Sequence, residues 1–320
     1  MANNRIAYGL AKQYGINTEG MEPKQVWDAL AGKGINQGNY QQYQNRQNES
    51  YNNILKSSIN NNTNTERSQE EQDLLDQLSR GEYLEIEELK NHPVVKMLEE
   101  KSKQTYEKYG DTSELPGREK KREQWKQEFL SHGSVVDKDG KDLSGPIKKE
   151  FRAVIVTGLP AAGKSSKIVN PLSKEIGGFV FDNDEIKGLI DEFKESGGAA
   201  AQSVHDESKL IQEDAFKEFL TGGGRNGDNL IIPKIGDDAN DLQTKLIDKL
   251  EKAGYDVEIQ YNPAPLKDSM NRVVMRGIKT GRIIPLSVVE KYGDGPEKTY
   301  EHFKVKTNKQ GKPFVRKEYK

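Results

Sequence analysis

The chain has 320 residues, a formal net charge of −2 and no cysteine. These values exclude disulfides, thiolate metal sites and a cysteine nucleophile, and they give no overall basic field that would favour nucleic acid or an anionic membrane. Only 33% of the residues are hydrophobic and 31% are charged, so we expect part of the chain to be solvated helix or linker rather than one continuous core.

The first 65 residues predict a small helical element followed by a tether. Within residues 1–35, two segments with helical apolar spacing each end at a glycine, and Pro23 is placed to open the second; this pattern predicts a helical hairpin. A docking element and a plain appendage both fit its size. Residues 36–65 contain ten Asn and five Gln, too little apolar surface to offset the entropy of ordering, which predicts a linker.

Residues 66–135 are dense in charge, with Leu and Val at helical spacing. The pattern predicts two to four amphipathic helices, interrupted at Gly81 and at His92–Pro93. Their charge runs indicate solvated helix faces. The turn-rich stretch 131–146 then marks a domain boundary.

From residue 150 to residue 320 the pattern is α/β. Apolar, β-branched runs at 152–158, 177–184, 228–236 and 255–262 alternate with helical stretches. This alternation predicts a mostly parallel sheet with helices on both faces.

The turn after the first of these runs matches the pattern G-x-x-x-x-G-K-[ST] over residues 158–165. Gly158 and Gly163 allow the backbone to turn its N–H groups around a phosphate, and the following helix points its positive end there. Lys164 is expected to neutralise the β- and γ-phosphates, and the Ser165 hydroxyl to bind Mg²⁺. The residues expected to contact the nucleotide are Gly158, Leu159, Pro160, Ala161, Ala162, Gly163, Lys164, Ser165 and Ser166.

Two carboxylates follow the second run, Asp182 and Asp184. They emerge at the same sheet edge as the glycine-rich turn, which is where ligands bind in open α/β sheets. A carboxylate there can accept the proton of a hydroxyl that attacks the γ-phosphate. Capping of the next helix is an alternative role for one of the pair.

Three arginines form the last motif. Arg272 and Arg276 are four residues apart on an expected helix, so they share a face, and Arg282 follows the turn at Gly281. An arginine-bearing segment of this kind stabilises charge on a transferred phosphoryl group. A solvated basic helix is the alternative.

The order of these motifs over residues 151–303 resembles the zeta toxin family of bacterial and phage-borne P-loop kinases, whose best-described members phosphorylate the 3′-hydroxyl of UDP-N-acetylglucosamine. The resemblance implies a P-loop kinase-type α/β fold preceded by a helical N-terminal region. It also implies that Asp184 is the base, that Glu213 holds the substrate, and that Arg272 and Arg282 are the catalytic arginines alongside Lys164. We further expect His205, Asp182 and Arg276 to contact the substrate, although His205 also fits as the first residue of a helix.

One departure concerns the acceptor. Pro233 stands where the sugar-nucleotide kinases of this family carry an acidic residue, and proline offers neither an N–H nor a carboxylate. The acceptor is therefore expected to be a small, nucleotide-like hydroxyl compound, with UDP-N-acetylglucosamine as the default and NAD, the substrate of related plant-pathogen effectors, as the alternative. Phosphorylation of polynucleotide 5′-ends is disfavoured, because no basic groove with interleaved aromatics accompanies the site.

The resemblance also implies restraint of the toxin. We expect ATP as the donor, Mg²⁺ as the cofactor and a helical antitoxin that acts in cis or in trans. Residues 66–135 are a candidate for inhibition in cis, or alternatively for a delivery module of a phage or secreted toxin. No membrane partner is expected, since the N-terminus lacks a signal-peptide pattern and no apolar stretch of spanning length occurs. The expected location is the cytoplasm, of a bacterium or of a target cell.

Overall fold

The structure, a computed structural model, describes residues 11, 16–18, 20–31, 67–132, 147–222 and 225–318. The chain divides into two compact units, residues 1–56 with 137–141, and residues 57–136 with 142–320. The linker predicted at 36–65 lies outside the described residues, and so does most of the turn-rich stretch 131–146.

In the first unit, the described helix is α2, Pro23–Ala31. It begins at the proline that the sequence marked as a helix start. Val26 and Leu30 are fully buried and cluster with Ala11. Except for Ala11, the first helix predicted for the 1–35 hairpin lies outside the described residues.

The second unit is built on a parallel sheet of four strands within the described residues, β1 (Arg152–Thr157), β2 (Phe179–Val180), β3 (Leu230–Pro233) and β4 (Asp256–Tyr261). The strand order is β2-β3-β1-β4. All four strands fall within the apolar runs of the sequence, which confirms the predicted α/β fold with a parallel sheet.

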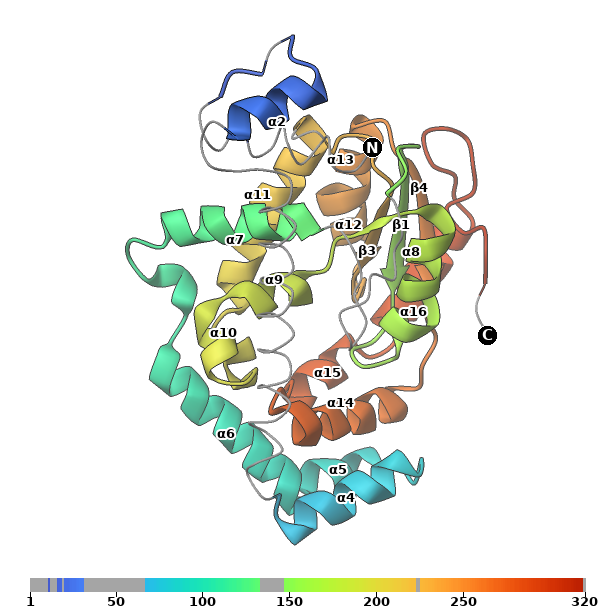
Figure 1. Cartoon of the computed structure of the whole chain (residues 1–320). Helices are drawn as coiled ribbons and strands as arrows, with labels where there is room; N and C mark the ends of the chain where they lie inside the picture. The colour runs from blue at the N-terminus through green and yellow to red at the C-terminus, as the bar shows by residue number, and fades with distance from the viewer. Residues whose placement is uncertain are drawn as a thin grey trace. The chain divides into compact units, whose positions relative to one another are not determined.

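Side chains of β1 alternate between two hydrophobic layers. Ala153 and Ile155 join a cluster with α9, α11, α12, α13 and α16 on one face, while Val154 and Val156 join η2 and α8 on the other. Figure 1 shows α8 on the opposite side of the sheet from α11 and α13. The covering elements are η2 (Ser165–Val169), α8 (Asn170–Ile176), α9 (Asn183–Leu189), α10 (Asp191–Glu195), η3 (Ala199–Ala201), α11 (His205–Thr221), α12 (Ala239–Leu242), η4 (Gln243–Ile247), α13 (Asp248–Lys252), α14 (Leu266–Thr280), α15 (Leu286–Tyr292) and α16 (Gly295–Lys304).

The charged region forms four α-helices within 67–132, at the upper end of the predicted range: α4 (Gln69–Ser79), α5 (Ile86–Asn91), α6 (Pro93–Tyr109) and α7 (Glu119–His132), with a short η1 (Thr112–Glu114). Both predicted interruptions occur. Gly81 adopts a left-handed φ of 81° after α4, and His92 caps α6, whose first residue is Pro93.

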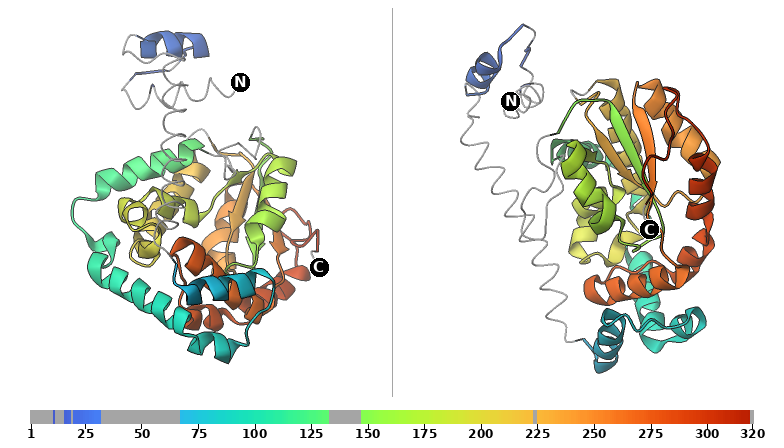
Figure 2. Two further views of the ribbon diagram at one scale, coloured as in Figure 1. Left: turned by 60° about the horizontal axis from the view of Figure 1, so that its bottom comes forward. Right: turned by 90° about the vertical axis from the view of Figure 1, so that its right-hand side faces the viewer.

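These helices pack on the rest of the second unit. One hydrophobic cluster joins leucines and valines of α4–α6 to the apolar side of α14, and Trp125 and Phe129 of α7 join the main core beside α9 and α11. Figures 1 and 2 show α4, in cyan, lying beside α14, in orange. The charged, solvated faces predicted for these helices are therefore their outer sides, while their apolar sides are buried. Among the described residues, every helix is too short or too polar to cross a bilayer.

Candidate active site

The glycine-rich turn leaves the carboxyl end of β1 at the point where the chain connections diverge. The crossover after β1 passes β3 to reach β2, whereas the crossover after β3 passes β1 to reach β4. In open α/β sheets such a divergence opens a crevice at the strand ends, where ligands bind. Residues 158–165 therefore lie at the position where this fold binds a phosphate.

The backbone of this turn needs its glycines. Gly158 has a φ of 145° and Gly163 a φ of 89°, values that favour glycine. A Cβ on Gly158 would also lie 2.8 Å from the carbonyl oxygen of Asn262, so the turn is pressed against the end of β4. Ala161 holds a φ of 52° without being glycine, a strained conformation of the kind that clusters at ligand sites.

Four carbonyl groups of the turn are held by side chains. Lys164 Nζ donates to the oxygens of Gly158 and Leu159, at 2.6 and 2.8 Å. Ser269 Oγ, from α14, donates to Pro160 O at 2.5 Å, and Asn262 Nδ2 donates to Ala162 O at 2.8 Å. Ser269 and Asn262 are buried. They keep the turn in one conformation, and no sequence motif marks either of them.

Asp182 and Asp184 flank the start of α9 with different surroundings. Asp182 caps the helix, its Oδ1 accepting from Asp184 N at 2.9 Å. Burial and the charge of Asp184 raise the pKa of Asp182 to about 6. Asp182 thus takes the capping role that the sequence offered as an alternative, and Asp184 is left as the candidate base.

Asp184 Oδ1 lies 2.6 Å from Arg282 Nη2 and 3.6 Å from Lys187 Nζ. Partial burial alone would raise the pKa of this carboxyl, but the positive charges of Arg282 and Lys187 outweigh it and lower the pKa below its ordinary value. Asp184 is therefore ionised at neutral pH. Lys187, one helical turn along α9, was not predicted as a site residue, although its i+3 spacing from Asp184 could have indicated it.

Arg276 and Arg282 carry buried donors that find no acceptor among the described residues, namely Nε and Nη2 of Arg276 and Nε of Arg282. Burial, and the nearby charge of Arg282, lower the pKa of Arg276 to about 10, so the guanidinium group of Arg276 stays charged at pH 7. Buried charged donors without acceptors are unfavourable unless an anion reaches them. The pair therefore suits a phosphate.

Comparison with known proteins agrees with this geometry. A model of the zeta toxin family matches residues 140–318, which is more than half of the chain. The chain belongs to the zeta toxin family. It is thus a P-loop kinase-type toxin, of a family associated with ATP and with antitoxin partners. No curated protein and no solved structure is significantly similar to the chain.

The first phosphate-binding arginine expected in the zeta toxin domain, Arg272, lies one helical turn before Arg276 on α14. Its Nη1 is 3.5 Å from Ala162 O and its Nη2 is 3.5 Å from Asp268. Its Nε donates to the hydroxyl of Tyr83, at 3.0 Å. The structure thus places Arg272 beside the glycine-rich turn, and Arg276 and Arg282 beside Asp184.

The remaining predicted substrate contacts lie along α11. His205 is the first residue of this helix, and partial burial with the charges of Lys187 and Lys209 lowers the pKa of His205 to about 4, so its ring is neutral at pH 7. Glu213 is exposed, and within the described residues no hydrogen bond or ion pair joins it to Asp184; its negative charge partly opposes the effect of burial on the pKa of Lys234. Within the described residues, His205 and Glu213 thus form no hydrogen bond with Asp184, the candidate base.

The turn after β3 carries a cation, Lys234, directly after Pro233. Pro233 ends β3, and Lys234 Nζ donates to Gln212 Oε1 of α11 at 3.0 Å. Burial lowers the pKa of Lys234, against the opposing charges of Asp182 and Glu213. The buried Nε2 of Gln212 has no acceptor among the described residues. The sequence indicated only that Pro233 lacks an N–H and a carboxylate, and the hydrogen bond between Lys234 and Gln212 was not predicted.

The donors available for Mg²⁺ are oxygens. No group of three His, Cys, Asp or Glu side chains within the described ranges is arranged to hold a metal ion, so a cation here needs phosphate oxygens as ligands. Ser165 is exposed at the start of η2, directly after Lys164. A hydroxyl ligand supplemented by phosphate oxygens fits the preference of Mg²⁺.

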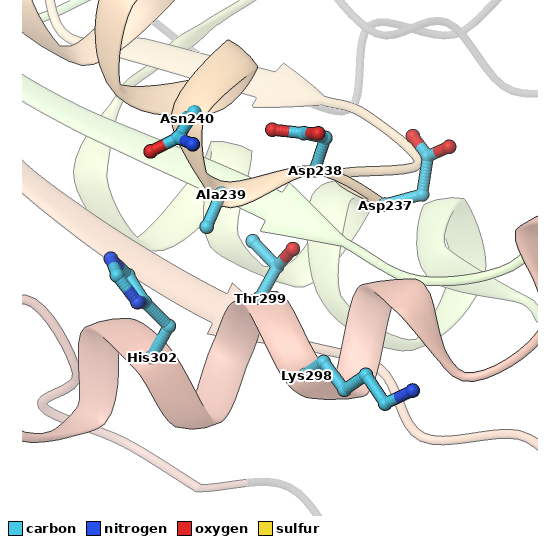
Figure 3. A pocket seen from close by; sticks show the side chains of 7 residues that line it. All are labelled: Asp237, Asp238, Ala239, Asn240, Lys298, Thr299 and His302. Atoms are coloured by element: carbon cyan, nitrogen blue, oxygen red, sulfur yellow. The ribbon is translucent and has the colours of Figure 1, made fainter.

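A separate cavity of about 340 Å³ lies between the loop after β3 and α16. Thr299 and His302 project from α16 towards the segment that carries Ala239 and Asn240 (Figure 3). The cavity contains none of the predicted site residues, and two of its charged groups are engaged locally: Asp238 caps α12 and Lys298 pairs with Asp294. It therefore does not compete with the crevice at β1 as the catalytic site.

Proposed function

We propose that this zeta toxin domain transfers the γ-phosphate of ATP to a hydroxyl group of a small, nucleotide-like metabolite. The observation that carries the proposal is the contact of Asp184 with Arg282 beside Arg276, whose buried donors lack an acceptor. Lys164, from the glycine-rich turn, lies close enough for its charge to act on Asp182 and Asp184. An ionised base and several cations for phosphate thus share one sheet edge.

In the proposed reaction, Asp184 accepts the proton of the acceptor hydroxyl. The hydroxyl oxygen forms a bond to the γ-phosphorus, and the bond between that phosphorus and the β,γ-bridging oxygen breaks, which releases ADP. Lys164, Arg272 and Arg282 stabilise the negative charge that spreads over the transferred group. Ser165 and the phosphates hold Mg²⁺, which neutralises charge on the β- and γ-phosphates.

The Asp184–Arg282 ion pair couples these roles. While Arg282 neutralises Asp184, the carboxylate is a weak base, because the opposite charge lowers its pKa. An incoming γ-phosphate competes for the guanidinium and so restores basicity to Asp184. We propose that the base becomes effective only when donor phosphate is present.

The acceptor is proposed by class. UDP-N-acetylglucosamine is the default from the family, and an NAD-type nucleotide is the alternative because Pro233 replaces the expected acid. Lys234 and Gln212 support an acceptor with an anionic or carbonyl group on the α11 side. His205, neutral at pH 7, supports a hydrogen-bonding role towards that acceptor.

The decisive experiment incubates the full chain with γ-labelled ATP, Mg²⁺ and a metabolite extract, with UDP-N-acetylglucosamine and NAD in separate reactions. Asp184→Asn should remove the labelled product, because an amide cannot accept the proton. Asp182→Asn is the matched control, since asparagine preserves the cap of α9. Persistence of product in Asp184→Asn would refute the base assignment, and labelling of water alone would refute the kinase proposal.

Regulation by residues 66–135 remains a prediction. The packing of α4–α7 on α14, α9 and α11 supports their being part of the same folded unit, which argues against loosely tethered cargo. If the full chain phosphorylates its acceptor and is toxic to cells without any added partner, restraint in cis is contradicted. A helical antitoxin in trans is tested by capture on the full chain and loss of ATP binding.

A further inference from the structure

A short segment that precedes the family-matched residues contacts the arginine helix. Residues 83–85 join α4 to α5, and each meets a residue of the first two turns of α14: Tyr83 meets Arg272, Leu84 meets Asn271 and Glu85 meets Lys267. The family model matches residues 140–318 only, so this segment belongs to no part of the matched domain.

The backbone of the segment is fixed at Leu84. Its N–H donates to Asn271 Oδ1 at 3.1 Å, and its carbonyl accepts from Asn271 Nδ2 at 2.9 Å. Asn271 is fully buried, and Leu84 belongs to the hydrophobic cluster shared by α4–α6 and α14. A buried side chain that bonds both backbone groups of one residue sets that residue's position along α14. The neighbouring Tyr83 is therefore placed with little freedom.

The Tyr83 hydroxyl accepts from Arg272 Nε at 3.0 Å, and the guanidinium carbon lies 5.8 Å from the centre of the tyrosine ring. The two terminal nitrogens of Arg272 make longer contacts of 3.5 Å, to Ala162 O and Asp268. The strong contact is thus at Nε, which leaves the terminal nitrogens, beside the glycine-rich turn, as those able to exchange partners for a phosphate oxygen.

We propose that Tyr83 is a positioning residue for Arg272, so that one side chain from before the family-matched residues supports the kinase site. The inference rests on the proposed function, in which Arg272 stabilises the transferred phosphoryl group. Tyr83 orients the guanidinium through Nε and through its ring, and it does not touch the nucleotide. Without this contact, the orientation of the long Arg272 side chain would have to be fixed while the transition state forms, which costs entropy.

If Tyr83 instead held Arg272 away from the nucleotide, removing its hydroxyl would raise kcat rather than lower it. The direction is measured by steady-state hydrolysis of Mg–ATP by the full chain, with kcat and KM determined separately and thermal unfolding recorded for each variant. Tyr83→Phe should lower kcat by about threefold to tenfold, the effect of losing one hydrogen bond of ordinary net strength, with KM for ATP changed less than about twofold. The melting temperature should stay within about 2 °C of the wild type, because the ring and its packing remain.

Two comparisons separate the inference from the proposed function. Arg272→Ala should reduce kcat more than Tyr83→Phe, and adding Tyr83→Phe to it should cause no further loss. Glu85→Gln is the control, since it removes the ion pair with Lys267 in the same segment and should leave kcat unchanged. If Arg272→Ala turns over like the wild type, the proposed role of Arg272 fails. If Arg272→Ala is impaired but Tyr83→Phe has unchanged or higher kcat, the positioning role alone is overturned.

Discussion

Arg118, from the turn before α7, binds the carboxylate of Glu207 in α11 through two guanidinium nitrogens, Nε and Nη2. The Glu207 side chain is fully buried. Arg118 Nε lies 2.9 Å from Oε1 and Nη2 lies 2.5 Å from Oε2. Arg122 Nε adds a third contact to Oε1 at 3.0 Å. The carboxylate inside the kinase core is therefore neutralised by residues that precede the family-matched domain.

Removal of Arg118 should destabilise the whole second unit. Arg118→Ala leaves Glu207 buried with only Arg122, and we expect a loss of about 3 kcal/mol in the free energy of unfolding, as for other broken buried pairs. Urea unfolding at pH 7 measures the loss. Lys121→Ala is the control, because its pair with Asp191 is solvent-exposed and should contribute little to stability. Equal effects of the two variants would contradict a special role for Arg118.

The packing of α4–α7 also predicts what a cut chain does. A protease site placed between His132 and Ile147 should, after cleavage, give two fragments that elute together in size exclusion, because separation would expose the apolar side of α14 and leave Glu207 without its arginines. A delivery module with releasable cargo predicts instead that the C-terminal fragment elutes alone and remains folded.

Gly158 should not tolerate a side chain. In Gly158→Ala, the new Cβ meets Asn262 O at 2.8 Å on a backbone with a φ of 145°, so the turn must shift. We expect Mg–ATP binding to weaken by roughly tenfold or more, equivalent to about 1.4 kcal/mol of strain. Titration calorimetry gives the affinity. Gly188→Ala in α9 is the matched control, since nothing lies within 4 Å of its added Cβ, and ATP affinity should be unchanged.

Asp182 and Asp184 should affect stability with opposite dependence on pH. Because folding raises the pKa of Asp182 from 3.8 to about 6, its ionisation disfavours the folded state. The wild type therefore loses stability from this group as the pH rises through 6. Asp182→Asn should be more stable than wild type at pH 8, by at most about 3 kcal/mol, and the difference should disappear below about pH 4.

The pKa of Asp184 is lowered, so its charge supports folding at neutral pH, and this support is lost only as the pH falls below its ordinary value. Asp184→Asn should therefore be less stable than wild type at pH 7, and equal to it in strong acid. Thermal melts of both variants between about pH 2 and pH 8 test the pair of predictions. Parallel pH profiles for the two variants would overturn the assignment of their environments.

Several features of the fold were predictable because they depend on local pattern. The four apolar runs contain the strands, and the pattern at 158–165 lies at the end of the first, as a phosphate turn requires. The expected proximity of Asp184 to the glycine-rich turn followed from the rule that parallel strands end at one sheet edge, and Lys164 lies close enough to interact electrostatically with Asp184. The contact of Asp184 with Arg282, which follows a helix, was not predicted. The amphipathic pattern of 66–135 predicted that one face of each helix is buried, but not against what, since periodicity does not name a partner.

Other site residues carry no local signal. Asn262 and Ser269 act through single hydrogen bonds to carbonyls of a turn about 100 residues away in sequence, and their types are common in strand ends and helices. Tyr83 is separated from Arg272 by 189 positions, and nothing in its neighbourhood distinguishes it from the other tyrosines. Only tertiary packing shows what these side chains contact.

Helix α14 carries Arg272 and Arg276 on one side and buries Val273 and Val274 against α4–α6 on another. Its tilt and rotation are therefore set in part by Leu75 and Leu78, which belong to the same cluster. In a genetic selection for cells that survive expression of the toxin, inactivating mutations should fall in two separate parts of the gene. One group should cluster at residues 158–165, and the other at core leucines of α4 that never meet ATP.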